Sequence, residues 1–440
     1  MRTLIHNGLA LLKDGGGWKV EKKDILVEGN RIRAVGGDCG GAEEVIDAAD
    51  HLVMPGLINA HTHPYMTIQR NYADDLAFFD WLEKMDQVEQ GMTEEDVYWT
   101  TMLAIAEMIR SGTTCFVDMA IKSAREKSGP KGAAAGAVYD SGFRAVICRG
   151  LAGRADSEES LRKFGEAVAE MDLYRGESRL RFVHGPHAPY SCMPDYLRKL
   201  TGSCRERGIG QHIHLSESRT EMESIARDRG GMTPIRYVDS LGVFDVPCIV
   251  AHAVYATEED IRILKAKGVS VVLCPKSNMK LGNGFAPAKK LLDAGVNVAL
   301  GTDGAGSNNA LNMFSEMNAA GLVYKGDTRS ARCVDAGDVL NMATVNGAKA
   351  MRRAGELGEI REGALADLIL LDLNVPQFVP RNNLISGLVY SATGSEVDTV
   401  MVDGRVLMRD RKLTTIDEKA VFEAVERIAD RLGMERKTRI

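Results

Sequence analysis

The sequence predicts an α/β fold, a (β/α)8 barrel of the TIM type with a small composite β-sandwich formed by both chain ends. Between residues 55 and 355, eight short β-rich runs alternate with helical stretches. The segments before and after this region contain strands and turns, and the first has no helical period. We therefore expect a barrel domain at 55–355 and a composite β-sandwich domain with a C-terminal helix at 1–54 and 356–440.

The eight β-rich runs are short and separated by helical candidates. A doubly wound sheet would use fewer repeats and usually a glycine-rich phosphate loop after its first strand, and neither feature is present. The runs are one that ends at His61, then Thr113–Asp118, Arg144–Cys148, Leu180–His184, Ile209–His214, Cys248–His252, Val269–Cys274 and Val296–Leu300.

Several helix starts are marked by capping residues. Thr93 and Thr257 each precede three acidic residues, which is typical of an N-cap followed by an acidic first turn. Pro194 suits the first position of another helix. The tail at 416–434 has helical spacing and is expected to be a packing or subunit helix.

The two chain ends carry hairpin signals. Residues 24–32 form two β-rich runs around a Gly-Asn turn, and residues 397–407 form a pair around Asp403-Gly404. The first segment is too small to hold a core alone. We therefore expect both ends to meet in one β domain.

Composition excludes several classes of protein. The 440 residues carry a net charge of -6, which argues against a nucleic-acid partner because phosphate binding requires a basic face. No run approaches the roughly 20 apolar residues of a membrane helix, and the first residues lack the apolar stretch of a signal peptide. Eight scattered cysteines without Cys-x-x-Cys favour reduced thiols and a cytoplasmic location. The oligomeric state stays open, a homo-oligomer included.

His61 and His63 stand at the end of the first barrel strand. Side chains alternate along a strand, so these two imidazoles point the same way and form half of a metal site. Taken alone, a His-x-His pair is equally compatible with two core or surface histidines.

The ends of later strands supply the other half. His214 ends the fifth run, His252 ends the sixth, and Asp303 follows the eighth. Barrel enzymes place their chemistry at the C-terminal ends of their strands. Five such side chains at matching strand ends, His61 and His63 included, are hard to explain by a separate structural role for each. The pattern therefore favours one functional site.

The residue types narrow the chemistry. Three imidazoles and a carboxylate suit one divalent metal ion, with Zn2+ expected and Fe2+ also compatible. Zinc lowers the pKa of bound water to about 7, which favours attack of hydroxide on an electrophilic carbon. Glu217 could protonate a ring nitrogen and help the leaving group, or act as a first-turn acid of the next helix. Asp303 could accept the proton of the water, and His252 could orient the nucleophile.

In order along the chain, these residues resemble the amidohydrolase superfamily. More narrowly, they resemble its 5-methylthioadenosine/S-adenosylhomocysteine deaminase branch, which is related to s-triazine hydrolases. The resemblance covers nearly the whole chain. It is carried by the segments 55–63, 70–76, 81–82, 111–114, 185–190, 212–217, 251–252, 274–282 and 300–309.

The resemblance implies a mononuclear site. Its ligands would be His61, His63, His214 and Asp303, while Glu217 and His252 would handle protons. The binuclear relatives use a carboxylated lysine at the end of strand four, where this chain has none. The resemblance also implies that both chain ends form a composite β-sandwich.

It further implies substrate contacts at Glu89, Arg149, His187 and Glu217. Glu89 is chosen by its distance to Thr93, because this chain has Asp-Gln-Val-Glu where the family usually has Trp-Pro-apolar-Glu. If it matches, its carboxylate would accept hydrogen bonds from sugar hydroxyls. Trp81 closes an aromatic-rich loop on which a flat heterocycle could stack, or which could be core.

The function expected from these residues and the resemblance is a metal-dependent hydrolytic deaminase. It would convert an adenine nucleoside, such as 5-methylthioadenosine, S-adenosylhomocysteine, adenosine or 5'-deoxyadenosine, to the inosine analogue and ammonia. One alternative is a deaminase or chlorohydrolase of another heterocycle, such as an s-triazine, guanine or a pterin. The other is a metal-free structural homologue, against which the intact ligand set argues.

Overall fold

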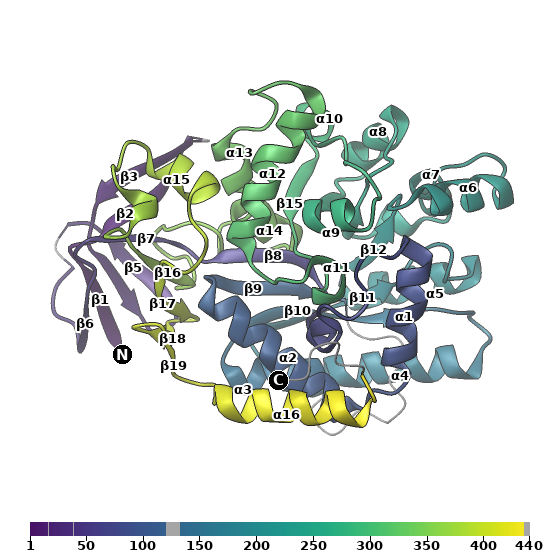
Figure 1. The fold of residues 1–440 in the computed structure, drawn as a ribbon, viewed down its shortest axis with the longest axis horizontal. Coiled ribbons are helices and arrows are strands. Elements are labelled where there is room, and N and C mark those ends of the chain that lie inside the picture. The colour runs from purple at the N-terminus through teal and green to yellow at the C-terminus, as the bar shows by residue number, and fades with distance from the viewer. Residues whose placement is uncertain (16, 38, 120–132, 435–440) are drawn as a thin grey trace.

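A parallel sheet curved into a nearly closed barrel forms the centre of the molecule in the computed structural model, which describes residues 1–15, 17–37, 39–119 and 133–434 (Figure 1). Eight strands follow one another in chain order, and the last lies against the first, so the predicted barrel is confirmed. The strands are β8 (Leu57–Thr62), β9 (Thr113–Asp118), β10 (Arg144–Leu151), β11 (Leu180–Pro186), β12 (Gln211–Leu215), β13 (Cys248–His252), β14 (Ser270–Leu273) and β15 (Asn297–Leu300).

Helices occupy the connections between the barrel strands. In chain order they are η1 (Pro64–Gln69), α1 (Phe78–Glu89), α2 (Glu94–Arg110), α3 (Ala133–Ser141), α4 (Glu158–Leu173), α5 (Pro194–Arg207), α6 (Arg219–Asp228), α7 (Pro234–Ser240), η2 (Val243–Asp245), α8 (Glu258–Ala266), α9 (Pro275–Lys280) and α10 (Ala288–Asp293). After the last barrel strand come α11 (Ala305–Asn308), α12 (Met313–Thr328), α13 (Ala336–Met342), α14 (Val345–Ala350), η3 (Pro376–Phe378), α15 (Leu384–Tyr390) and α16 (Glu418–Arg431).

The expected capping residues begin their helices. Thr93 and Thr257 form capping boxes with Asp96 and Asp260, in which each side chain bonds the backbone of the other residue. Pro194 occupies the first turn of α5. These caps fix where the helices start after the strand ends.

Two further sheets are built from the chain ends, on the left in Figure 1. A four-stranded sheet has the order β5-β4-β1-β6, and a seven-stranded sheet has the order β19-β18-β17-β16-β7-β2-β3. Their strands are β1 (Arg2–His6), β2 (Leu9–Asp14), β3 (Gly17–Lys22), β4 (Ile25–Glu28), β5 (Arg31–Val35), β6 (Glu44–Asp47), β7 (His51–Pro55), β16 (Leu368–Asp372), β17 (Val397–Val402), β18 (Arg405–Arg409) and β19 (Lys412–Leu413). The second sheet joins both ends of the chain, because β7 pairs with β16.

One glycine connects this sheet to the barrel. Gly56 separates β7 from β8, and its amide donates to the carbonyl of Asp367 at 3.0 Å. A Cβ at Gly56 would lie 2.1 Å from Oγ1 of Thr114, so no larger residue fits without displacing β9. The strand that carries His61 and His63 is therefore continuous with the composite sheet.

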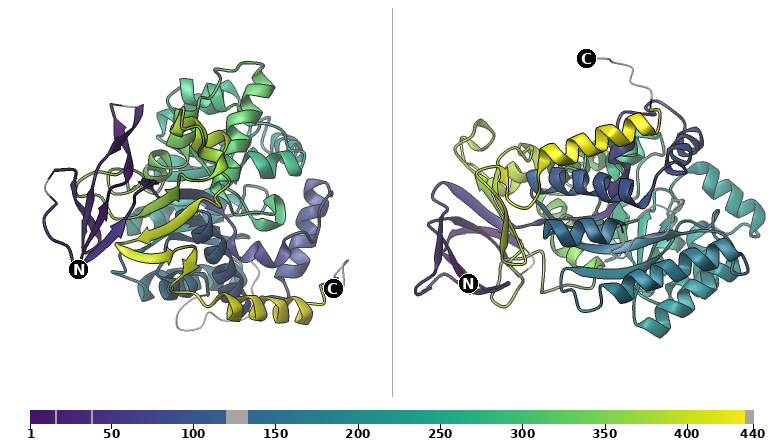
Figure 2. Two further views of the ribbon diagram at one scale, coloured as in Figure 1. Left: turned by 60° about the vertical axis from the view of Figure 1, so that its left-hand side comes forward. Right: turned by 90° about the horizontal axis from the view of Figure 1, so that it is seen from below.

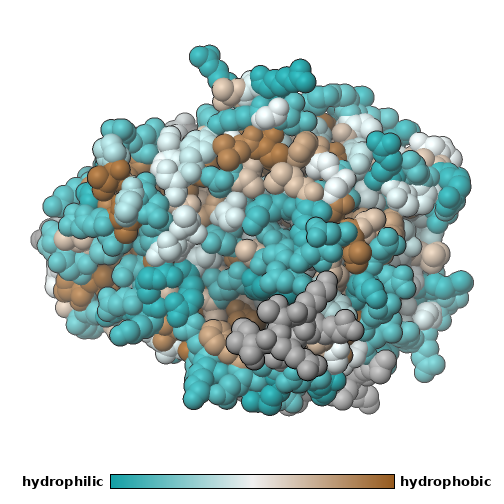
Figure 3. All heavy atoms as spheres, viewed as in Figure 1, coloured by the Kyte–Doolittle hydropathy of each residue, from teal (hydrophilic) through white to brown (hydrophobic). Residues whose placement is uncertain are grey.

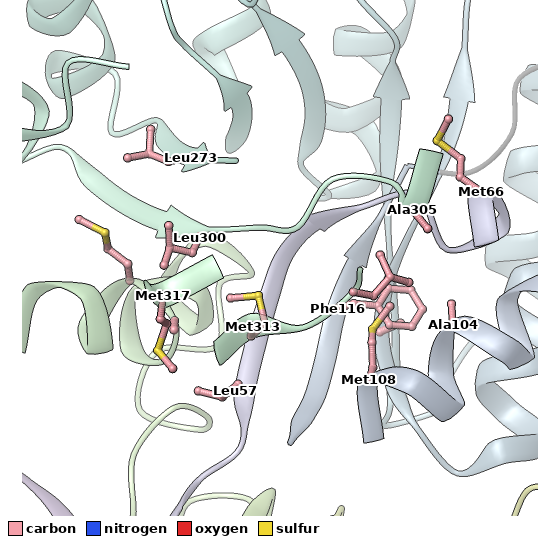
Figure 4. Packing of buried hydrophobic residues seen from close by; sticks show 14 of the residues in the cluster. Leu57, Met66, Ala104, Met108, Phe116, Leu273, Leu300, Ala305, Met313 and Met317 are labelled. Carbon is pink, nitrogen blue, oxygen red and sulfur yellow. The ribbon is translucent and has the colours of Figure 1, made fainter. Parts of the chain in front are cut away.

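The core has an outer layer between strands and helices and an inner layer inside the barrel. In the outer layer Phe116 of β9 points toward Met108 and Ala104 of α2 (Figure 4). Inside the barrel, neighbouring positions such as Val117 and Val146 belong to a separate apolar cluster. The alternation of strand side chains thus holds around the barrel.

Two arginines, Arg144 and Arg110, form ion pairs that hold the C-terminal part of the chain on the barrel. The fully buried Arg144 of β10 places Nε 2.7 Å from Asp367 and Nη2 2.7 Å from Asp403. Helix α16 lies beside α2 (Figure 2), where Arg110 pairs with Glu418 at 2.5 Å.

The surface in Figure 3 is mostly hydrophilic, with hydrophobic residues in separate small groups. No helix in the described part of the chain is long and apolar enough to cross a membrane. The eight cysteines are buried free thiols.

Candidate metal centre

The C-terminal ends of the barrel strands bring five predicted residues together. His61 and His63 come from β8, His214 from β12, His252 from β13, and Asp303 follows β15. The ring Nε2 atoms of His61 and His63 each lie 3.2 Å from Oδ1 of Asp303, and Nε2 of His214 lies 3.3 Å from Nε2 of His63. All five side chains are buried.

Backbone contacts fix the protonation of two rings. Nδ1 of His63 donates to the carbonyl of Met119 at 2.8 Å, and Nδ1 of His214 donates to the carbonyl of His187 at 2.7 Å. A neutral imidazole carries one proton, so both Nε2 atoms present lone pairs. Such a hydrogen bond to a carbonyl is the usual support of a metal-ligating histidine.

The residues fit a divalent cation. Two nitrogen lone pairs face each other across 3.3 Å, and Nε2 of His61 is buried without a hydrogen-bond partner among the described residues. Buried polar atoms are normally satisfied, and a cation among these atoms would satisfy both features at once. Three imidazole nitrogens and one carboxylate oxygen form a donor set that zinc accepts.

Burial favours the neutral form of His61 and His214, and metal ligation requires neutral imidazoles. Burial lowers the pKa of His61 to about 4, against the opposing attraction of Asp303. Burial also holds the pKa of His214 well below its usual range, helped by the neighbouring histidines. For Asp303, burial opposes ionisation, but the contacts with His61 and His63 outweigh it and bring the pKa well below the ordinary value.

Two hydroxyl groups orient the Asp303 carboxylate. Oγ of Ser277 and Oγ of Ser307 donate to its Oδ2 at 2.6 Å and 2.8 Å. The other oxygen, Oδ1, is thereby directed at the histidines. Asp303 has a positive φ of 59°, a backbone conformation that costs energy outside glycine and is often found at functional sites.

Glu217 is a buried acid next to this cluster. Its Oε1 lies 3.7 Å from Nε2 of His252 and accepts a hydrogen bond from Nδ2 of Asn283 at 3.3 Å. Burial raises the pKa of Glu217 well above its ordinary value, and the negative charges of Asp303 and Glu221 add to the effect. These surroundings therefore favour the protonated form of the carboxyl group, the form that a proton donor needs.

The turn that carries Glu217 is held by Glu221 of α6. The Glu221 carboxylate accepts hydrogen bonds from the backbone amides of Ser216 at 3.2 Å and Glu217 at 2.8 Å. Ser216 has a φ of 55°, so the turn is bent between the strand and the helix. Glu221 therefore holds the turn, while Glu217 lies beside the histidines.

His252 is oriented by a side-chain amide. Its Nδ1 lies 3.0 Å from Oδ1 of Asn278 in α9 and donates to that oxygen. The lone pair on Nε2 therefore faces Glu217 and the other histidines.

Two of the predicted substrate residues lie next to the centre. The ring of His187 is 5.0 Å from that of His214, and its Nδ1 lies 2.9 Å from Oγ of Ser191. Glu89 ends α1 and accepts a hydrogen bond from the hydroxyl of Tyr65 at 2.8 Å. The Tyr65 ring is 6.1 Å from His63, so Glu89 is connected to the centre through one aromatic residue.

Two further predicted substrate residues, Arg149 and Trp81, lie in different surroundings from the centre. Arg149 points out of the barrel to an acidic group on α2 and α4, with contacts of 3.4 Å to Glu94, 3.7 Å to Glu166 and 3.6 Å to Glu170. Trp81 is buried in the outer core, and its indole nitrogen donates to the carbonyl of Gly306 at 3.2 Å.

Sequence reasoning left out several residues that complete the centre. Nε2 of His212 lies 3.1 Å from Nδ1 of His61 and supports that ring from inside the barrel. The alternation argument that paired His61 with His63 would also have paired His212 with His214. Ser277, Asn278 and Asn283 follow the seventh strand, but their partners could not be read from their spacing.

A cluster of three imidazoles and a carboxylate at the strand ends of a (β/α)8 barrel defines a barrel protein with a candidate metal site. The family model described as "Amidohydrolase family" matches residues 52–407 of this chain. The chain belongs to the amidohydrolase family.

Curated relatives and solved structures are similar to nearly the whole chain. The 5-methylthioadenosine/S-adenosylhomocysteine deaminase of Caldanaerobacter subterraneus subsp. tengcongensis is 43% identical over 418 residues, which cover 94% of each chain. The enzyme of the same name from Moorella thermoacetica is 43% identical over 413 residues, covering 92% of this chain and 94% of its own.

Two solved structures contain zinc. An adenosine deaminase from Xanthomonas campestris with bound zinc has a TM-score of 0.91 and 31% identity, covering 98% of this chain and 99% of its own. An atrazine chlorohydrolase from Arthrobacter aurescens TC1, complexed with zinc, has a TM-score of 0.87 and 23% identity, covering 97% and 99%. The second similarity shows the fold alone.

Proposed function

We propose that this protein is a metal-dependent aminohydrolase that converts an adenine nucleoside of the 5-methylthioadenosine or S-adenosylhomocysteine type to its inosine analogue and ammonia. The names of curated relatives with 40% to 45% identity support this substrate class. One observation carries the reaction itself: two buried carboxyl groups, Glu217 and Asp303, flank the same histidine cluster, and their surroundings shift their pKa values in opposite directions.

The proposed ligands of one divalent ion are His61, His63, His214 and Asp303. Zinc is the proposed metal because the donor set suits it and because the solved adenosine deaminase from Xanthomonas campestris, 31% identical, has bound zinc. A zinc ion in such a site supplies Lewis acidity and lowers the pKa of a coordinated water to about 7.

Glu217 is the proposed general acid. Addition of water at C6 of the purine places negative charge on N1, and the protonated carboxyl of Glu217 can neutralise it by donating its proton there. Asn283 holds Oε1 of Glu217, and Glu221 holds the backbone beneath it. The acid is therefore pre-positioned before the substrate arrives.

Asp303 and His252 are proposed to act on the attacking water. Nε2 of His252 accepts a hydrogen bond from the water and aligns its lone pair with C6. Asp303 accepts the proton that the water loses and returns it to the exocyclic amino group. The C6–N bond then breaks and ammonia leaves, while the C6 hydroxyl gives its remaining proton back to the Glu217 carboxylate as the C6 carbonyl forms. Water supplies the oxygen, so the products balance as one inosine analogue and one ammonia.

The proposed substrate contacts lie at different distances from this chemistry. Glu89 and His187 are the proposed contacts of the sugar side. The support is that His187 lies beside His214 and that Glu89 bonds Tyr65, which lies beside His63. Arg149 is retained as a proposed contact from the family resemblance, and Trp81 from its place at the end of an aromatic-rich loop. Arg149 would have to reach the substrate from its acidic surroundings, and Trp81 from the core.

A substrate panel tests the proposal. Purified protein is assayed for ammonia with 5-methylthioadenosine, S-adenosylhomocysteine, adenosine, 5'-deoxyadenosine, guanine and atrazine, with chloride measured for the last. We expect ammonia in equal amount to the inosine analogue from at least one adenine nucleoside. Turnover of guanine or atrazine alone would refute the proposed substrate class. If metal-loaded protein turned over none of these compounds, the proposal that the protein is an aminohydrolase would be refuted.

A further inference from the structure

A cavity of about 360 Å³ opens at the N-terminal end of the barrel, the opposite end of the strands from the metal centre. It is bordered by the first residues of β11, β12 and β13 and by the end of α14. The lining residues that carry the argument are Val146, Val183, Ile249, Met351, Arg181 and Arg352.

The floor of this cavity is apolar. Val146, Val183 and Ile249 point into the barrel, where they form one cluster with Met351. Barrel interiors are normally packed with side chains. Val183 is nevertheless only half-buried, which shows that the cavity reaches into the barrel interior.

Two guanidinium groups stand at the rim. Arg352 donates to the carbonyl of Gly208 at 3.1 Å, and Arg181 donates to the carbonyl of Arg352 at 3.2 Å. These bonds fix both side chains at the opening. Because the partners are neutral carbonyls, they leave the positive charges in place.

Positive charge exceeds negative charge around the rim. Glu356 lies 3.6 Å from Arg181 and 2.9 Å from Arg353, so one carboxylate serves two guanidiniums. Arg352 makes no ion pair within the described residues. The pKa of Arg181 is lowered by burial and by the positive charges of its neighbours Arg353, Arg352 and Arg144, against the attraction of Glu356. A bound anion would relieve this repulsion.

We propose that the N-terminal end of the barrel holds a second binding site, which takes a small organic oxyanion with a compact apolar body. The apolar part would rest on the barrel-interior floor, and the carboxylate or phosphate group would meet Arg181 and Arg352. The volume lies within the roughly 300–1,000 Å³ of small-molecule pockets. This site is independent of the proposed reaction, because none of its lining residues belongs to the metal centre.

Brominated probes test this site in the intact, metal-loaded protein. Calorimetry measures binding of 4-bromobenzoate and 4-bromophenyl phosphate, with 4-bromobenzamide as the neutral match, and crystal soaks locate bromine by its anomalous signal. We expect saturable binding of at least one anion and a bromine peak above Val183. The tighter of the two anions identifies the carboxylate or the phosphate ester as the preferred group.

Three variants separate this site from binding elsewhere. Arg352→Gln should weaken binding about tenfold, as expected for the loss of one charge-assisted contact. Val183→Phe should abolish binding by filling the floor, while Arg262→Gln, an arginine of α8 outside the cavity, should leave it unchanged. Nucleoside turnover should stay the same in all three. No saturable binding, equal binding of the benzamide, or a bromine peak only at the metal centre would overturn the proposal.

Discussion

His63 and His214 face each other through their Nε2 atoms at 3.3 Å, although each ring has committed its only proton to a backbone carbonyl on the far side. No hydrogen bond can join two lone pairs. The two rings are stacked within 9° of parallel at 5.4 Å, so the arrangement is held by the strands rather than by attraction between the rings. A positive ion between them converts this repulsion into binding energy.

Metal removal should therefore destabilise the protein. An ion that binds only the folded state adds about 2.7 kcal/mol at a hundredfold excess over its dissociation constant. We expect close to one zinc per chain, a lower melting temperature after chelation, and recovery when zinc is returned. His214→Ala should lose the zinc-dependent rise, whereas His6→Ala, an exposed histidine of the β-sandwich, should keep it. Equal melting temperatures with and without zinc would contradict the assigned ligands.

Glu217→Gln should keep the metal and lose turnover. The amide has nearly the shape of the acid but no proton to give to the purine, and general acid catalysis is worth about 10²- to 10⁴-fold. Steady-state kinetics should show a fall in kcat of that size, with metal content unchanged. The same substitution at the exposed Glu223 is the control. A Glu217→Gln enzyme with near wild-type kcat would remove the residue from the mechanism.

Glu221→Gln should damage the turn that positions Glu217. One oxygen of Glu221 would become an NH2 group that faces a backbone N–H of Ser216 or Glu217. We expect a loss of about 1–3 kcal/mol in unfolding free energy, the cost of leaving a buried donor unsatisfied. We also expect kcat to fall more than KM rises, because the acid is displaced while the sugar side is untouched. Glu223→Gln, on the same helix, should change neither quantity, and an equal rise in KM would point to a binding role instead.

Arg144→Met should lower the free energy of unfolding, because Arg144 joins the barrel to the β-sandwich through Asp367 and Asp403. It would leave Asp367 buried and Asp403 mostly buried, both without their shared positive partner. Removing one member of a buried ion pair costs about 3–5 kcal/mol. Denaturant unfolding measures the change. Arg154→Met breaks an exposed pair with Asp156 and should cost under about 1 kcal/mol. Similar losses in the two variants would show that Arg144 contributes no more than a surface pair.

The eight barrel strands could be predicted because each is a short apolar run bounded by turn or cap residues. The helix starts at Thr93 and Thr257 were equally visible, since a capping box is a local pattern. The positions of His61, His63, His214, His252 and Asp303 followed from one rule about barrel strand ends. Their meeting in space needed no long-range information beyond the strand order.

Other features depend on contacts that no local pattern encodes. Arg149 has the same strand parity as Ile147, whose side chain belongs to the outer core, and this parity directs it toward α4. The hydroxyl of Ser277 and the amide of Asn283 reach residues 26 and 66 positions away in sequence. Trp81 is an aromatic on a helix, and its periodicity is the same for a core residue and a stacking platform.

The pairing of β7 with β16 affects the order in which parts of the fold can form during synthesis. Its hydrogen-bonding partner β16 begins at Leu368, yet β7 leads through Gly56 straight into the strand that bears the first two histidines. A ribosome makes the chain from the N-terminus, so His61 and His63 emerge early while the strand that anchors their support emerges some 300 residues later. The strand that carries His61 and His63 is therefore fully anchored only after β16 has been synthesised.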